Sequence, residues 1–174
     1  LLGNKKNNAV IEFVYQGPLL KLVKGKTKIA ISGNVYFKII KSNRDTFDGV
    51  CNRSYDLNEG DQIDILATRK SCYGCLAVEG GFEIDSFCNS FSTLVKARIG
   101  PNKGNKFNID DKIIIKKNSE NKKNFSANVD LENSNVIRVL KGPQYDYFSE
   151  SSKKEFFSEN YKITNSTDRM GMRL

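Results

Sequence analysis

The apolar residues of this chain occur mainly in short runs of four to eight residues, each separated from the next by turn residues. The runs are rich in Val, Ile, Phe and Tyr, which favour β-strands, and they have the length of ordinary strands. Several of them recur at the even spacing of a sandwich or barrel. The sequence therefore predicts an all-β fold. Its strands are expected at residues 9–15, 28–32, 35–40, 62–67, 75–78, 92–99, 112–117 and 136–140.

One pattern occurs twice, as LNEGDQIDI at 57–65 and FNIDDKIII at 107–115. Each copy places an acidic turn directly before a strand, which suggests two equivalent hairpins in one barrel. Asp61 and Asp111 can be interpreted as paired catalytic carboxylates. The favoured interpretation is that each Asp accepts hydrogen bonds from backbone amides of its own turn.

A single segment, residues 147–160, has a helical pattern. Ser149 is suited to the N-cap position, because a serine oxygen can accept from the free amides of the first turn. Phe148, Phe156 and Phe157 can share one inward face of the helix. The sequence therefore predicts one short helix late in the chain.

The stretch at 116–135 is polar and almost free of large apolar side chains, which predicts a mobile loop or linker. We therefore expect three parts. Residues 1–115 form a β-barrel domain, residues 116–135 a polar loop or linker, and residues 136–174 the start of a second β unit.

The formal net charge is +8, which is typical of nucleic-acid binding when it is concentrated on one face. Here the lysines are scattered, without interleaved aromatic residues that would stack on bases, and charge runs usually form solvated surfaces. There is also no apolar run long enough for a membrane span and no signal-peptide pattern at the start. We expect a cytoplasmic chain without nucleic-acid or membrane partners.

Cys72 and Cys75 have the C-x-x-C spacing of zinc or redox sites. The other two cysteines do not form a second such pair, and the chain contains no His. Cys75 opens an apolar strand, so a small buried hydrophobic residue is the favoured interpretation, with zinc as the alternative. We expect no metal site. Without His, any chemistry must use carboxylates, Lys, backbone amides or a cofactor.

Four separated motifs carry a resemblance to a known family. They are LAVEGGFEI at 76–84, SFST at 90–93, IRVLKGPQYDYFSE at 137–150 and STDRMGMRL at 166–174. In this order they resemble the KipA family, which is also known as the C subunit of 5-oxoprolinase or as allophanate hydrolase subunit 2. That family is related to part of the carboxyltransferase region of urea carboxylase. Any one motif alone would be a weak signal.

The resemblance implies a cyclophilin-like β-barrel followed by a second, incomplete β unit. It also implies association with a KipI-like B subunit and, as a further candidate, an A subunit. The implied reaction is ATP-dependent opening of the small molecule 5-oxoproline to glutamate. Two alternatives are a biotin-dependent carboxyltransferase component like that of urea carboxylase and a non-catalytic, KipA-like regulatory or binding subunit. The expected cofactor is ATP, with or without Mg, at a site shared with the partner, and biotin only under the carboxyltransferase alternative.

The matched motifs also imply a set of site residues. Asp168 and Arg169 are the expected catalytic pair, and Arg173 can complete a fork for a carboxylate. The expected substrate-binding residues are Gly80, Gly81, Ser92, Thr93, Gly142, Pro143, Gln144, Gly171 and Arg173. Under the structural alternative, Asp168 and Arg169 close a turn with surface ion pairs, and the Gly142-Pro143 pair only redirects the chain.

The chain also departs from the family pattern. Phe91 replaces an Arg in the motif that the family commonly writes as G-S-R-S-T. Arg98 and Pro101 stand where the family usually has Gly, and Asn105 where Arg is common. Because Phe91 lacks the charge and the donors of Arg, an anion site that used that Arg would be impaired. The family continues further at both ends, so we expect a partial copy.

Overall fold

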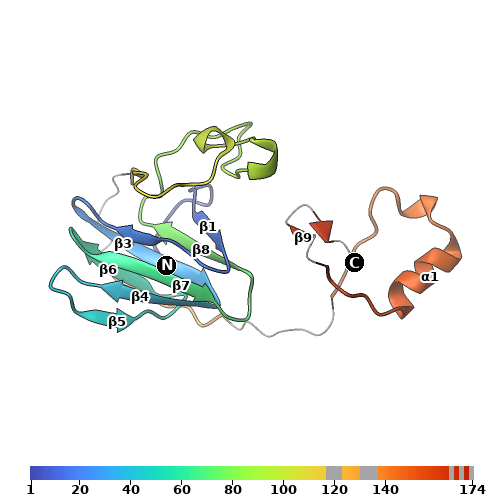
Figure 1. Cartoon of the computed structure of the whole chain (residues 1–174), viewed down its shortest axis with the longest axis horizontal. Coiled ribbons are helices and arrows are strands. Elements are labelled where there is room, and N and C mark those ends of the chain that lie inside the picture. Colours follow the sequence, from blue (N-terminus) through green and yellow to red (C-terminus); the bar gives the residue numbers. More distant parts are fainter. Residues whose placement is uncertain (117–122, 130–136, 165–166, 169–170, 173–174) are drawn as a thin grey trace. The chain divides into compact units, whose positions relative to one another are not determined.

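The computed structural model describes residues 1–116, 123–129, 137–164, 167–168 and 171–172 (Figure 1). The chain divides into two compact units, which we call unit 1 (Leu1–Leu131) and unit 2 (Glu132–Leu174). Unit 1 contains two four-stranded antiparallel sheets, and unit 2 contains the helix and a two-stranded sheet.

Both sheets of unit 1 mix strands that are distant in the sequence. Sheet 1 has the order β1-β8-β3-β6, and sheet 2 has the order β2-β7-β4-β5. The strands of sheet 1 are β1 (Ile11–Val14), β3 (Lys26–Gly33), β6 (Ser54–Asn58) and β8 (Tyr73–Val78). The strands of sheet 2 are β2 (Leu19–Lys21), β4 (Val35–Ile40), β5 (Thr46–Asp48) and β7 (Gln62–Thr68).

One hydrophobic core draws side chains from both sheets. Along β4, buried and half-buried residues alternate, as the two-residue period of a strand requires. Phe37 and Ile39 of β4 are fully buried, together with Ile31 of β3 and Ile65 of β7. The all-β prediction is confirmed, because the apolar runs bury their side chains in a single core between the two sheets.

Beyond β8, the three predicted strands are absent from the described residues, so these predictions are wrong there. Residues 92–99 contain a 3-10 turn, η1 (Val95–Ala97), and an isolated bridge between Leu94 and Ile99. Residues 112–116 form an isolated bridge between Ile115 and Phe82, with backbone bonds from Glu83 N to Ile114 O and from Lys116 N to Gly81 O. The run at 136–140 is described from residue 137, without a strand. A strand needs a neighbour with which to pair, and an apolar run does not supply one.

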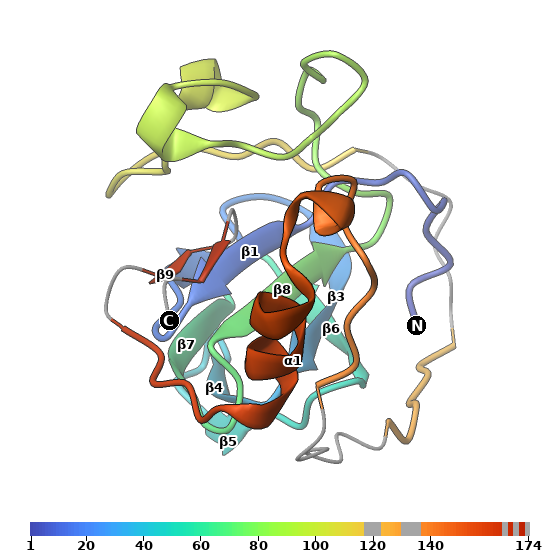
Figure 2. The same cartoon turned by 90° about the vertical axis from the view of Figure 1, so that its right-hand side faces the viewer.

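The segment with η1 and a second 3-10 turn, η2 (Asn102–Gly104), projects beyond the two sheets (Figures 1 and 2). Most side chains in this segment are exposed, but Pro101 and Gly104 are buried. These two residues therefore form the packed centre of the segment.

Unit 2 contains η3 (Tyr145–Tyr147), α1 (Glu150–Ser158), β9 (Thr167–Asp168) and β10 (Gly171–Met172). The predicted N-cap is confirmed, since Ser152 N donates to Ser149 Oγ at 3.1 Å. The predicted inward aromatic face is not: Phe148, Phe156 and Phe157 are all exposed. Phe156 instead packs edge-on against Phe157. Among the described residues, no helix is long and apolar enough to cross a membrane.

Candidate functional site

Gly80 and Gly81 form the turn that follows β8, and both have the positive φ angles that favour glycine (79° and 82°). The amide and the carbonyl of Gly80 are both engaged within the chain. Gly80 N donates to Asn4 Oδ1 at 2.9 Å, and Gly80 O accepts from Asn8 Nδ2 at 2.9 Å. In this structure the glycine turn fastens the first residues of the chain to the end of β8.

Ser92 and Thr93 form the base of the projecting segment. Thr93 Oγ1 donates to Pro101 O at 3.3 Å. Gly100, with φ 115°, lies so close to this base that a Cβ there would overlap Ser92 O and approach Thr93 Cα to 2.9 Å. These two predicted site residues therefore pack against a tight loop. The loop can close only because residue 100 lacks a side chain.

The same loop closes a second time at Gly104. Its amide donates to Gly100 O at 3.0 Å. A Cβ at this position would overlap the carbonyl carbon and oxygen of Arg98. Arg98 itself has φ 54°, in the left-handed region that glycine adopts most easily, and it stands where the resembling family usually has Gly. The loop is thus a compact, backbone-packed structure.

The loop surrounds an open cavity of about 620 Å³, which we call the basic cavity. Four cationic side chains and one carboxylate line it. Its lining residues are Val95, Lys96, Arg98, Asn102, Lys103, Asn105, Lys106, Asn108 and Asp111. Cations gathered around one concave surface raise the local concentration of anions, and Arg and Lys donate charge-assisted hydrogen bonds to carboxylates and phosphates. The basic cavity can therefore bind a small anion.

The repeated acidic turns have the structural role that the sequence favours. Asn58 N donates to Asp61 Oδ2 at 2.9 Å, and Asn108 N donates to Asp111 Oδ2 at 2.7 Å, so the two turns have the same cap. Because each carboxylate binds amides of its own turn, the interpretation as turn caps is confirmed.

Asp61 is the buried member of this pair, with 1% of its surface exposed. It also accepts from Ser42 N at 2.9 Å and from Lys41 Nζ at 2.8 Å. Burial raises the pKa of the Asp61 carboxyl, but the bonds from Asn58, Lys41 and Ser42 together hold it below its usual value. Asp61 is an ionised structural acid, unsuited to acting as a general acid at neutral pH.

A second open cavity, of about 590 Å³, lies at the departure from the family motif. Its lining residues are Asn7, Ser86, Asn89, Ser90 and Phe91. None of them is charged, so Phe91 contributes an aromatic wall where the family has a cation. Of these two cavities, the one lined by cationic side chains is the basic cavity.

The cysteine pair does not gather metal ligands in the described part of the chain. Cys75 is half-buried in β8, and Cys72 is exposed just before it. Among the described residues, no three His, Cys, Asp or Glu side chains come together in an arrangement that would hold a metal ion.

The remaining predicted site residues belong to unit 2. Gly142, Pro143 and Gln144 lead into η3, where Gly142 O accepts from Tyr145 N at 3.1 Å. Asp168 pairs with Gly171 between β9 and β10. Arg169 and Arg173 lie outside the described residues. The predicted site set is therefore divided between unit 1 and unit 2, and its catalytic role stays a prediction.

The lysines of the basic cavity are absent from the predicted set. In the sequence, Lys96, Lys103 and Lys106 look like members of the scattered surface lysines. The signal that could have found them is the short stretch GPNKGNK at 100–106, in which two glycines and a proline bring basic residues into one tight loop.

A family model described as the carboxyltransferase domain, subdomain A and B, matches residues 1–174. The chain is 25% identical to the urea amidolyase of Saccharomyces cerevisiae over 100% of its own length and 10% of that protein. It is 27% identical to the 5-oxoprolinase C subunit of Escherichia coli over 68% of this chain and 38% of that protein. The crystal structure of TTHA0988 superposes on 99% of this chain and 61% of its own with a TM-score of 0.82 at 22% identity. The chain thus spans less than two thirds of each of these proteins.

Proposed function

Because the chain belongs to the carboxyltransferase domain family, subdomains A and B, we propose that it acts as the C-type component of an ATP-dependent 5-oxoprolinase. The similarity to the 5-oxoprolinase C subunit of Escherichia coli supports this choice. In the proposal the chain works in the cytoplasm with a KipI-like B subunit and with an A subunit.

The observation that carries the proposal is the basic cavity. ATP is anionic, and 5-oxoproline has a carboxylate beside its lactam ring. Activating a lactam oxygen with ATP requires cations that hold phosphates and carboxylates, together with donors where negative charge develops. Arg98, Lys103 and Lys106 line the basic cavity and supply cations of this kind. We assign them the binding of the carboxylate or of a phosphate group.

For the matched motifs of unit 2 we retain the roles that the resemblance implies. Gln144 can bind a substrate amide, and Asp168 can orient Arg169 or accept from a substrate N–H. Arg169 and Arg173 can form a fork for a carboxylate. ATP, with or without Mg, would be shared with the KipI-like partner.

A biotin-dependent carboxyltransferase is the second candidate. The observation that favours it is the similarity to a urea amidolyase along the whole of this chain. The basic cavity would then hold the carboxylate group in transfer, and biotin would arrive on a carrier that belongs to another chain or domain.

The deciding experiment measures ATP hydrolysis by the complex of this protein with its A and B subunits, with and without 5-oxoproline. We expect stimulation by 5-oxoproline that disappears when this protein is omitted. Transfer of carboxyl from carboxybiotin to urea, without that stimulation, would select the second candidate. Co-purification without either activity would contradict the proposal and identify a non-catalytic, KipA-like binding component.

Removing charge from the basic cavity should weaken the use of substrate. The double variant Lys103→Ala/Lys106→Ala is expected to raise the KM for ATP or for 5-oxoproline by about ten-fold to a hundred-fold, because hydrogen bonds to charged groups contribute about 1.5–3 kcal/mol each. Lys24→Ala, on the loop between β2 and β3, is the matched control and should leave both KM values unchanged. Equal KM values in the double variant and the control would exclude the basic cavity as the anion site.

A further inference from the structure

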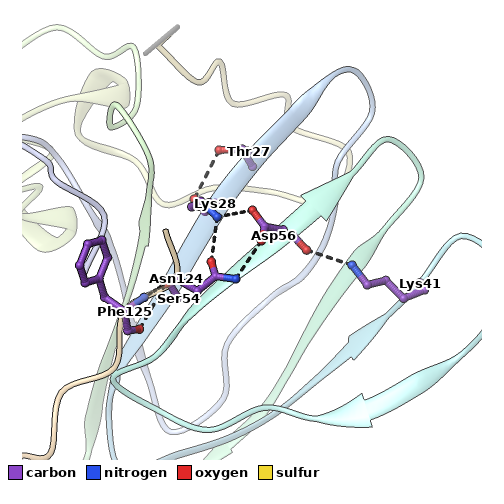
Figure 3. Close-up of polar contacts among 7 residues, drawn as sticks. All are labelled: Thr27, Lys28, Lys41, Ser54, Asp56, Asn124 and Phe125. Carbon is purple, nitrogen blue, oxygen red and sulfur yellow. Dashed lines mark hydrogen bonds and ion pairs between the residues drawn. The ribbon is translucent and has the colours of Figure 1, made fainter. Parts of the chain in front are cut away.

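Lys28 is a charged residue almost completely enclosed by protein, with 6% of its surface exposed on the central strand β3. A buried ammonium group is costly unless it is paired and hydrogen-bonded. Its Nζ atom forms an ion pair with Asp56 of β6 and donates to Asn124 Oδ1 at 2.8 Å (Figure 3). Asn124 is 96 residues away in the sequence. One hydrogen-bond partner of the buried Lys28 ammonium group therefore comes from the polar stretch at 116–135.

Asn124 binds both members of this ion pair. Its Oδ1 accepts from Lys28, and its Nδ2 donates to Asp56 Oδ2 at 3.1 Å. A side-chain amide offers an acceptor and a donor together, which a carboxylate or an alkyl group cannot do at neutral pH. Burial raises the pKa of Asp56, but the bonds from Lys28 and Asn124 hold it below its usual value. An amide side chain at position 124 therefore suits the Lys28–Asp56 ion pair better than a carboxylate or an alkyl side chain would.

The backbone beyond Asn124 is paired with the start of β6. Ser54 N donates to Phe125 O at 2.9 Å, and Phe125 N donates to Ser54 Oγ at 2.7 Å. One step further, Ala127 N donates to Asn52 O at 2.8 Å. Because β6 is the last strand of sheet 1, residues 123–129 cover its outer edge.

We propose that Lys28, Asp56 and Asn124 form an amide-specific latch that fixes residues 123–129 on the edge of β6. With the latch closed, the Phe125 and Ala127 amides stay hydrogen-bonded to residues 52–54 at the start of β6. The inference goes beyond the proposed function and holds for any activity of the chain.

Hydrogen exchange of the full chain tests the latch. Asn124→Leu is expected to speed exchange of the Phe125, Ala127 and Ser54 amides by about ten-fold or more, since local opening is set by the bonds that hold the segment closed. The Ile31 amide in the core strand β3 should exchange at the rate of the unchanged protein, which shows that the variant is folded. Asn128→Leu makes the same chemical change in the same segment and should have no effect on these amides.

Asn124→Asp tests the amide specificity. It keeps an acceptor for Lys28 but faces Asp56 with a second carboxylate, so we expect low protection factors (the intrinsic exchange rate divided by the observed rate) at pH 7 and higher ones in mild acid, where a protonated Asp can again donate. If Asn124→Leu and Asn128→Leu gave the same exchange rates, backbone pairing alone would hold the segment and the latch would be refuted.

Discussion

Replacement of Asp61 by Ala should lower the free energy of unfolding by about 1.5–3 kcal/mol, because three donors lose a buried, charged acceptor. Asp61 is 1% exposed and accepts from Asn58 N, Ser42 N and Lys41 Nζ. Without the carboxylate, two backbone amides lose their acceptor and Lys41 loses its ion-pair partner. Urea denaturation of the full chain, followed by circular dichroism, measures the change.

Asp111→Ala is the matched control for this prediction. Asp111 caps the same turn through Asn108 N, but its side chain is exposed and forms no ion pair with another described residue. Water can replace its single capping bond, so we expect a loss of about 1 kcal/mol. Equal losses of unfolding free energy in Asp61→Ala and Asp111→Ala would show that burial of the charge adds nothing to the stability of the turn.

The acid dependence of the same variant has a defined sign. The folded-state pKa of Asp61 lies below the ordinary value of 3.8, so its contribution is fully present above that pH and is lost as the pH falls through the folded-state pKa. The difference in unfolding free energy between the unchanged protein and Asp61→Ala should therefore be constant near neutral pH and shrink below about pH 4. A difference that grows toward acid would contradict an ionised Asp61.

Gly104→Ala should weaken the anion binding proposed for the basic cavity by about a hundred-fold or more. Residue 104 has φ 72°, and its added Cβ would overlap the carbonyl group of Arg98. Backbone atoms cannot move aside as a flexible side chain can, so the loop must open and displace the Arg98, Lys103 and Lys106 side chains from one another. A shift of about 1 Å in binding groups can already cost about a hundred-fold. Calorimetric titration with ATP and with inorganic phosphate measures the affinity.

Gly25→Ala separates this effect from backbone strain alone. Gly25 has φ 85°, and a Cβ there would meet nothing within 4 Å. The variant should lose about 1 kcal/mol of stability from the left-handed backbone while keeping the anion affinity unchanged. An anion affinity that is intact in Gly104→Ala would mean that the loop geometry does not form the site.

The sequence by itself determined the local features of this protein. The apolar runs that became β1, β3, β4, β7 and β8 could be recognised because short runs of strand-favouring residues, bounded by turn residues, are visible in consecutive positions. The Ser149 cap and the two Asp-capped turns could be recognised for the same reason, since donor and acceptor lie within three residues of each other. The strands β2, β5 and β6 escaped prediction because β2 and β5 are only three residues long, β6 has only Tyr55 and Leu57 as apolar residues, and all three depend on pairing with their neighbours.

Tertiary structure alone decided what those local features do. The repeated turns share the pattern apolar-Asn-x-x-Asp-x-Ile-x-Ile, yet of the two Asp side chains only Asp61 is buried, because Lys41 and Ser42 reach it from another hairpin. The apolar run at 92–99 does not form the predicted strand. The chain instead folds back on itself at Gly100 and Gly104, and this places four cationic side chains around a cavity. Burial, pairing of charge and cavity shape arise from groups that are distant along the chain, and their energies depend on distances that exist only in the folded protein.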